Sequence, residues 1–321
     1  MAGASALAAP LVTAVIPTYG RSEALQDAVE SVLQQTYDPI ELVVVDDASP
    51  EPVEPLVTDL VTDAGVPVTC IRHETNQGAN AARNTGIRAG DGDLVAFLDD
   101  DDRWKPDSIE RRVDALSGRP SVGLVYSDAV TVDADGAVLH ETTSSISGDA
   151  TRALLRGGIV GSFSRVLVRR SVIDDAGLPD ERFPSWQDWE WYIRLSQHCQ
   201  FEHVSEPLTV RRTENEQITD DHEQKRDESY PLMLETHRDT AAADGWRTKR
   251  QFEAACARSL AASALQNGYW VDAVRFAVRA ARAYPFSTET ALYLALAVGG
   301  PGTFKPAQVV RRWLTTRRHR S

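Results

Sequence analysis

The sequence has few cysteines, no long apolar run and no common nucleotide-binding loop. Its three cysteines are far apart and show neither metal-ligand nor redox spacing, so we expect buried, reduced thiols. No apolar stretch is long enough to span a bilayer. No G-x-G-x-x-G follows the first predicted strand, and no G-x-x-x-x-G-K is present. These absences exclude a membrane span and the usual dinucleotide and P-loop folds.

Lysine is scarce, although the chain is strongly charged. Only Lys105, Lys225, Lys249 and Lys305 are lysines, and the formal net charge is −13. Non-specific nucleic-acid binding needs a positive surface, so we expect no nucleic-acid partner. An acidic composition with so little lysine is typical of halophilic proteins, where it reflects adaptation to the solvent. The apolar residues 2–9 follow no positive charge and lead into a strand, so we expect no signal peptide.

The first part of the chain alternates strands and helices at short intervals. The predicted strands cover 11–16, 40–45, 67–72, 94–98, 121–127, 164–169 and 201–212, with a hairpin over 129–140. This alternation predicts an α/β fold whose mainly parallel sheet is flanked by helices. From about residue 228 the pattern becomes helical. We therefore predict an α/β domain over 1–215 and an α-helical region over 216–321.

Four successive carboxylates, Asp99 to Asp102, follow the apolar run 94–98. If the side chains keep alternating, Asp99 and Asp101 share one side, and Asp100 and Asp102 face the other way, toward solvent, loop donors or a sugar hydroxyl. Two converging carboxylates suit Mg²⁺ or Mn²⁺, which in turn would hold a phosphate. The alternative is a solvated acidic turn before a helix over 106–116.

Polar residues also end two other predicted strands, at Pro17-Thr18-Tyr19 and at Asp46-Asp47. Ligands of open α/β sheets bind outside the carboxyl ends of the strands. Three polar endings on one edge therefore predict a single binding site there. Asp188 lies at the start of a predicted helix over 185–195 that is rich in aromatic residues. The helix dipole favours a carboxylate at this end, so the position of Asp188 can also be explained without a catalytic role.

The tail 305–321 is basic, whereas the chain as a whole is acidic. It contains Lys305, five arginines and no acid, and Trp313 lies among apolar residues at helical spacing. A basic amphipathic end suits an anionic membrane surface, so we expect a peripheral membrane contact. The alternative is a helix whose arginines pair with the acidic α/β domain.

Four ordered motifs carry a resemblance to a known family. They are Val15–Tyr19, Val44–Ser49, the stretch from Asn76 to Gly86, and Phe97–Trp104. Together they resemble the family 2 inverting glycosyltransferases with a GT-A fold, over about 12–212. Gly177–Phe183 and Gln187-Asp188-Trp189 look like later elements of the same family. The resemblance implies a nucleotide-sugar donor, with a UDP-sugar as first candidate, and Mn²⁺ or Mg²⁺ as cofactor.

The resemblance also implies residue roles at the nucleotide. Pro17, Thr18 and Tyr19 would hold the nucleotide through backbone contacts and stacking. Asp46 would accept a hydrogen bond from the base. Gly78 would let the chain pass close to the nucleotide.

Further roles follow near the diphosphate and the acceptor. Arg83 would steady the site near the diphosphate, and Asp99 and Asp100 would contact the donor. Asp101 would coordinate the cation, which offsets charge on the departing diphosphate. Asp188 would be the general base that deprotonates the acceptor hydroxyl.

Two positions depart from the family's pattern. Gln187 replaces the usual Glu, which removes a like charge that would raise the pKa of Asp188. Glu190 remains an alternative base. Pro179 stands where the family often has an aromatic residue on the acceptor side. The segment 142–149 is expected to be a mobile loop, followed by a short helix over 151–156 and a glycine-rich segment over 157–162. The whole stretch 142–162 is expected to shape donor and acceptor specificity.

The composition also resembles haloarchaeal members that extend lipid-linked glycans for protein N-glycosylation. That likeness implies a dolichol-phosphate-linked acceptor and a cytoplasmic protein on the cytoplasmic face of the membrane. An exopolysaccharide or glycolipid acceptor is the first alternative. A nucleotide-sugar-binding protein that has lost catalysis is the second, suggested by Gln187 alone.

Overall fold

The computed structural model describes residues 9–61, 65–133, 135–212 and 221–303. The predicted basic tail 305–321 and most of the N-terminal apolar run lie outside these residues. The predicted domain boundary at 215 also falls outside them, so the division into two domains stays a prediction. Every described element from residue 222 onward is helical.

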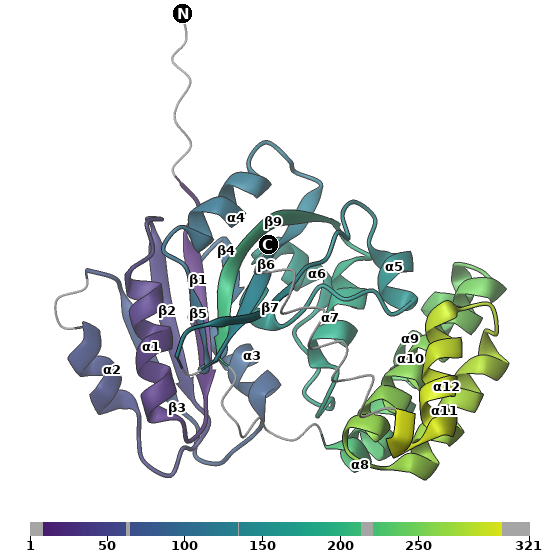
Figure 1. The fold of residues 1–321 in the computed structure, drawn as a ribbon. Helices are drawn as coiled ribbons and strands as arrows, with labels where there is room; N and C mark the ends of the chain where they lie inside the picture. Colours follow the sequence, from purple (N-terminus) through teal and green to yellow (C-terminus); the bar gives the residue numbers. More distant parts are fainter. Residues whose placement is uncertain (1–8, 62–64, 134, 213–220, 304–321) are drawn as a thin grey trace, which may run out of the picture.

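The strands form one mixed sheet within the described residues, in the order β3-β2-β1-β4-β8-β6-β9-β5, with β7 paired to β6 (Figure 1). The strands are β1 (Val12–Thr18), β2 (Ile40–Asp46), β3 (Val68–Arg72), β4 (Leu94–Phe97), β5 (Asp102–Trp104), β6 (Val122–Val132), β7 (Val138–Thr142), β8 (Val166–Arg169) and β9 (Gln200–Arg212). The parallel pairs β1–β2, β1–β4 and β2–β3 bring the carboxyl ends of four strands to one edge.

Helices cover both faces of this sheet. On one face lie α1 (Ser22–Leu33), α2 (Glu54–Val61) and α4 (Ser108–Leu116). On the other lie α3 (Ala79–Ala89), α5 (Thr151–Leu155), α6 (Arg170–Ala176) and α7 (Gln187–Leu195). All seven residues of β1 are buried, as expected for a strand covered on both faces. This explains why β1 is mainly apolar and does not alternate apolar and polar residues.

The C-terminal helices pack on the α7 side of the sheet (Figure 1). They are α8 (His222–Gln224), a π-helical turn over Lys225–Ser229, α9 (Tyr230–Ala243), α10 (Trp246–Gln266), α11 (Trp270–Ala283) and α12 (Thr288–Gly299). Phe252 and Cys256 of α10 share one core with Trp191 of α7 and Phe97 of β4. Because this core is continuous, α10 is fixed against the α/β part of the molecule.

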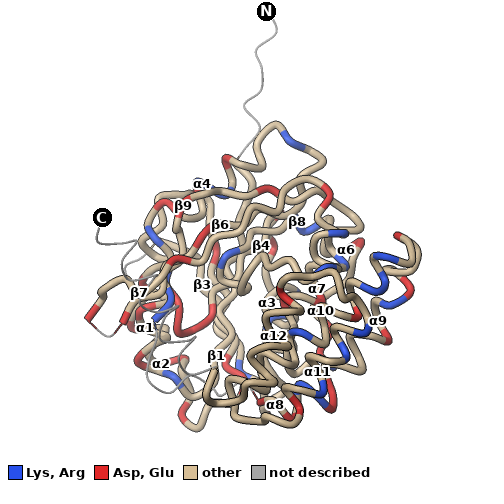
Figure 2. The backbone as a smooth tube through the Cα atoms, turned by 45° about the vertical axis from the view of Figure 1, so that its right-hand side comes forward, with Lys and Arg blue, Asp and Glu red and all other residues tan. Residues whose placement is uncertain are grey.

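The charged surface of the C-terminal helices is mixed. Both blue and red segments appear on α9 and α11 in Figure 2. No helix in the described part of the chain is both long enough and apolar enough to cross a membrane.

Several expectations needed correction. The chain over 122–132 is one long strand, β6, where we predicted a strand ending at 127 and a separate hairpin strand. The loop after β7 is anchored, because Gly148 pairs with Phe201 and the Tyr126 hydroxyl accepts from the Ile146 amide. Only Cys256 of the three free cysteines is fully buried.

Candidate active site

The carboxyl ends of β1, β2 and β4 border a cavity of about 530 Å³, which we call the strand-end cavity. Its lining residues are Pro17, Thr18, Tyr19, Arg21, Asp47, Asn76, Gly78, Ala79, Ala82, Arg83, Asp99, Asp100, Asp101 and Arg211. Eight predicted site residues are among them. The parallel register explains this gathering, since Thr18 pairs with Asp46 and Val15 with Phe97.

The acidic run does not continue the strand. After β4 the backbone turns over residues 98–101, so side chains no longer alternate. Asp99, Asp100 and Asp101 therefore all line the strand-end cavity. The expectation that Asp100 faces away from Asp99 and Asp101 is wrong, because alternation holds only for extended backbone.

Asp100 is held at the floor of this turn. Its carboxylate accepts from Thr18 Oγ1 at 2.8 Å and from Arg21 Nη1 at 3.1 Å. Burial raises the pKa of Asp100 to about 6, against the lowering effects of Thr18 and Arg21. Asp101 is more exposed and accepts from Arg21 Nη1 at 2.8 Å. Burial and the neighbouring charge of Asp99 raise the pKa of Asp101 as well.

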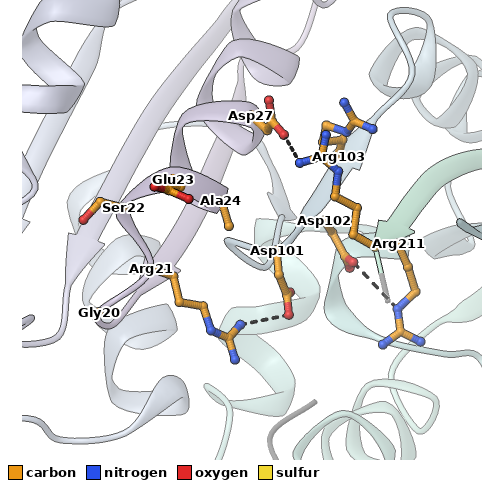
Figure 3. Close-up of a pocket in the computed structure, with 11 residues that line it drawn as sticks. Gly20, Arg21, Ser22, Glu23, Ala24, Asp27, Asp101, Asp102, Arg103 and Arg211 are labelled. Atoms are coloured by element: carbon orange, nitrogen blue, oxygen red, sulfur yellow. Dashed lines mark hydrogen bonds and ion pairs between the residues drawn. The ribbon is translucent and has the colours of Figure 1, made fainter. Parts of the chain in front are cut away.

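Asp102 points away from the strand-end cavity and is buried. It begins β5, which pairs with β9 so that Asp102 lies opposite Arg211. The two side chains are 3.7 Å apart, and burial together with Asp99 raises the pKa of Asp102 to about 8. Figure 3 shows Arg21 and Arg211 on either side of Asp101 and Asp102, around a second polar cavity of about 500 Å³. Arg211 lines both cavities.

The donor set suits a divalent cation only in combination with a bound phosphate. No group of three or more His, Cys, Asp or Glu side chains in the described residues could hold a metal ion. Asp99 and Asp101 supply two carboxylates in one cavity, and the charge of Asp99 raises the pKa of Asp101. Mg²⁺ is commonly bound by one or two carboxylates plus substrate phosphates. The residues present therefore fit a cation that arrives with, or is completed by, a diphosphate.

Asp46 lies beside the cavity rather than in its lining. Its carboxylate accepts from the Ser49 amide at 2.8 Å and from the Arg72 guanidinium. Burial raises its pKa, but the hydrogen bonds from Ser49 and Arg72 outweigh burial, and the pKa of Asp46 ends below its ordinary value. An ionised carboxylate at this position can accept a hydrogen bond, so the base-reading role stays a prediction.

Asp47, a predicted strand-end residue to which we assigned no role, organises the loop that carries Gly78. Its two carboxylate oxygens accept from the amides of Gln77 and Gly78 at 2.9 and 2.8 Å. Gly78 has φ 93°, and a Cβ there would point into open space. Glycine is thus required by backbone conformation, and it leaves the wall of the cavity clear.

Arg83 of α3 connects the acidic turn to α7. Its guanidinium donates to Asp99 Oδ1 at 2.7 Å and to Gln187 Oε1 at 3.0 Å, and it lies 4.0 Å from the centre of the Phe163 ring. Gln187 also donates through Nε2 to the Phe183 carbonyl at 3.0 Å. A glutamate could accept from Arg83 but could not donate to that carbonyl, so the amide satisfies both neighbours.

Asp188 lines a different cavity of about 540 Å³, which we call the α7 cavity. Its lining residues are Leu154, Gly157, Gly158, Ile159, Val160, Gly161, Trp186, Asp188, Trp189, Tyr192, Ala255, Arg258, Ser259, Ala262, Glu289, Leu292 and Tyr293. Burial raises the pKa of Asp188, although the Trp189 amide, which donates at 2.7 Å, and the charge of Arg83 lower it. A raised pKa suits a group that must take up a proton.

Glu190, the alternative base, lines neither cavity. It is buried and accepts from Arg194 at 2.7 and 2.9 Å, with His237 at 3.2 Å. Burial raises its pKa, but the bonds from His237 and Arg194 lower the pKa of Glu190 below the ordinary value. Its place favours a structural role, in an ion pair with Arg194 on the same helix and a contact with His237 of α9. Pro179 also lies outside the lining of the α7 cavity.

Sequence reasoning missed Arg21 and Arg211 in the strand-end cavity, and Trp186 and Tyr192 in the α7 cavity. Arg21 directly follows the first polar strand end and could have been found. Arg211 lies more than 100 residues from the acidic run, and only the β5–β9 pairing brings it there. Nothing in the sequence pattern signals that contact.

Comparisons with known proteins agree with this geometry. Residues 13–177 match the family described as glycosyl transferase family 2. A protein of Haemophilus influenzae named an uncharacterized glycosyltransferase is 28% identical over 202 residues, which is 62% of this chain and 67% of that protein. A Bacillus subtilis protein named putative teichuronic acid biosynthesis glycosyltransferase TuaG is 30% identical over 178 residues, or 54% and 68%.

A haloarchaeal relative matches a shorter stretch. The glucosyl-dolichyl phosphate glucuronosyltransferase of Haloferax volcanii is 39% identical over 121 residues, which is 37% of this chain and 38% of that protein. The matched stretch is thus well under half of either protein.

Solved structures share the fold at low sequence identity. Staphylococcus aureus TarS 1-349 in complex with UDP has a TM-score of 0.62 and 17% identity, with 85% of this chain and 81% of that chain covered. The mannosyltransferase PcManGT of Pyrobaculum calidifontis, in complex with GDP-Man and Mn²⁺, has a TM-score of 0.55 and 18% identity, with 95% and 87% covered. The predicted GT-A fold is confirmed. With its family match over half of its length, the chain belongs to glycosyl transferase family 2 and is a glycosyltransferase.

Proposed function

We propose that this glycosyltransferase moves a sugar from a nucleotide-sugar, with a UDP-sugar as the first candidate, to an acceptor hydroxyl with inversion at the anomeric carbon. The observation that carries the proposal is the position of Arg83. It bonds to Asp99 in the strand-end cavity and to Gln187, the neighbour of Asp188 in the α7 cavity. One buried guanidinium thus joins a charged cavity suited to a diphosphate to a cavity that contains a candidate base.

The donor would lie with its diphosphate beside Asp99, Asp101 and Arg211. Pro17, Thr18, Tyr19 and Gly78 line the same cavity and would contact the nucleotide, with Asp46 at the base and Asp100 holding Thr18 and Arg21 in place. Asp99 and Asp101 would hold a divalent cation, which supplies charge stabilisation for the departing diphosphate.

In the chemical step, Asp188 acts as the general base. Its carboxylate takes the proton of the acceptor hydroxyl as the acceptor oxygen bonds to the anomeric carbon. The bond between that carbon and the diphosphate oxygen breaks, and the nucleoside diphosphate leaves with the electron pair. Attack from the face opposite the diphosphate inverts the anomeric configuration.

A dolichol-phosphate-linked glycan in protein N-glycosylation is the acceptor that we favour. The name of the Haloferax relative and the acidic, lysine-poor composition support a haloarchaeal, halophilic setting. We place the chain at the cytoplasmic face of the membrane, with the tail 305–321 in peripheral contact. The name of TuaG supports an exopolysaccharide acceptor as the second candidate.

The test is release of nucleotide from a panel of nucleotide-sugars with Mn²⁺ or Mg²⁺ present, followed by NMR assignment of the anomeric configuration of any product. We expect release with at least one donor, loss of release with a chelator, and an inverted product. Nucleotide-sugar binding without turnover on any donor would instead support the non-catalytic binding protein. Elongation of a dolichyl-phosphate-linked acceptor separates N-glycosylation from the exopolysaccharide alternative.

A further inference from the structure

The α7 cavity is built by two parts of the chain that lie far apart in sequence. Asp188, Trp189 and Tyr192 come from α7, whereas Arg258 comes from α10 and Leu292 from α12. Figure 1 shows α10 and α12 together in the C-terminal bundle, on the side of the molecule where α7 lies. The C-terminal helices therefore supply one wall of the cavity that contains the proposed base.

One wall is aromatic and its backbone is strained. Trp186 has φ 61° and ψ 24°, a left-handed conformation that is uncommon for a bulky residue. Its ring packs edge-on against Trp189 at 5.4 Å, and Trp189 is fixed by donating through Nε1 to the Leu154 carbonyl at 2.9 Å. Such backbone strain persists at sites where it positions a functional group.

One of the side chains that line the cavity ends in a buried hydroxyl without a protein partner among the described residues. Tyr192 is 1% exposed, and its hydroxyl has no hydrogen-bond partner among the described residues. Leaving a buried hydroxyl unsatisfied is costly, so such a group points to a ligand that completes it. Tyr192 lines the same cavity as Asp188, whose charge is close enough to raise the pKa of Tyr192.

The opposite wall carries one charged pair. Arg258 of α10 donates to the Arg156 carbonyl at 3.3 Å and lies 3.0 Å from Glu289 of α12. The loop 157–161 closes against α10, since a Cβ on Gly157 would lie 3.1 Å from the Cβ of Ala255. Glycine at this position lets the backbone approach the helix.

We propose that the α7 cavity binds the terminal sugar ring of a glycan acceptor, with the C-terminal helices as its second wall. A pyranose has apolar C–H faces that can pack on Trp186 and Trp189, and hydroxyls that can bond to Tyr192, Asp188 and the Arg258–Glu289 pair. A lipid chain would leave these polar groups unpaired. This inference rests on the proposed function, since it takes the acceptor hydroxyl to lie near Asp188.

The test is saturation-transfer NMR on the full chain with UDP and Mg²⁺, using the methyl glycosides of glucose, mannose, galactose and N-acetylglucosamine as probes. We expect saturation of the ring protons of at least one probe. Tyr192→Phe removes only the hydroxyl, so its affinity for that probe should fall by about tenfold, the scale of one hydrogen bond. Its thermal stability should not fall, which a purely structural role for the hydroxyl would not predict.

Leu292→Trp and Val298→Trp form a matched pair on α12. Both leucine and valine are exposed, at 56% and 70%, but only Leu292 lines the cavity. Leu292→Trp should abolish probe saturation while UDP still binds, and Val298→Trp should behave like the unmodified chain. The inference is overturned if no probe is saturated by UDP-bound protein, or if the two tryptophan variants respond alike. If the protein binds no nucleotide, the proposed function is contradicted instead. The two failures can be distinguished, because probe saturation can also be measured without UDP.

Discussion

The strand-end cavity and the α7 cavity have nearly the same volume, about 530 and 540 Å³, but different lining residues. The first gathers the carboxylates of the acidic turn and the guanidiniums of Arg21, Arg83 and Arg211. The second is lined by aromatic and aliphatic side chains and glycines, with Asp188 and the Arg258–Glu289 pair as its charged groups. The difference supports the proposal that a charged diphosphate binds on one side of Arg83 and a sugar ring on the other.

The two cavities also differ in how the chain builds them. Most of the strand-end cavity comes from residues within the first hundred, where parallel strands end at one edge. The α7 cavity combines α5, α7, α10 and α12. Charged and strand-end residues determine the first cavity, while helix packing determines the second. Substitutions should therefore separate nucleotide binding from acceptor chemistry.

The largest expected effect is on the strand-end side. Asp101→Ala should reduce cation-dependent nucleotide release by about 10³-fold, the scale expected when a cation that stabilises charge by several kcal/mol is lost. Asp107→Ala, an exposed carboxylate in the segment that follows, is the control and should leave activity unchanged. Steady-state rates across a Mn²⁺ titration measure the effect. Equal responses of the two variants would remove Asp101 from the cation site.

Asp188→Asn tests the α7 cavity alone. We expect turnover to fall by roughly 10²-fold or more, the scale of a lost general base, with UDP affinity nearly unchanged. Turnover and calorimetric UDP binding are the measurements. Asp174→Asn on α6, an exposed acid, is the control. If Asp188→Asn weakens UDP binding as much as it slows turnover, the two cavities are not functionally separate.

Arg211 and Arg212 offer a finer comparison on neighbouring residues. Arg211 lines the strand-end cavity, whereas Arg212 pairs with Asp27 and lines only the second polar cavity. Arg211→Gln should weaken UDP binding by about tenfold, in line with one charge-assisted hydrogen bond, and Arg212→Gln should not. Thermal unfolding should accompany the calorimetry, because Arg211 also faces the buried Asp102. If Arg211→Gln and Arg212→Gln bind UDP with equal affinity, the diphosphate does not lie beside Arg211.

The smallest effect is expected at Gln187, which lies between the two cavities. Gln187→Glu adds a negative charge near Asp188, so the pKa of Asp188, already raised by burial, should rise further. A general base works only when deprotonated, so the acid limb of the pH–rate profile should move to higher pH. Gln197→Glu, on the turn after α7, controls for an added charge at a distance. An acid limb that stays in place would argue against Asp188 as the titrating base.

Much of the fold could be predicted from the sequence, because β-branched runs and helical spacing report local burial. The alternation of strands and helices predicted the parallel strands, and the polar strand ends predicted that Thr18 and Asp99 would lie together. The family resemblance added Gly78 and Arg83 to the same site. Local pattern failed where the backbone changed direction: the turn at 98–101 broke the alternation of the acidic run and left Asp102 buried.

The sequence by itself determined the family, the order of the elements and the charged edge of the sheet, since these depend on motifs and on periodicity within short segments. Only the tertiary structure decided that Arg83 bridges Asp99 and Gln187, that Arg211 reaches the acidic turn, and that α10 and α12 wall the cavity of Asp188. These contacts join residues separated by many tens of positions. They depend on how whole elements pack, and no periodicity within a segment encodes that packing.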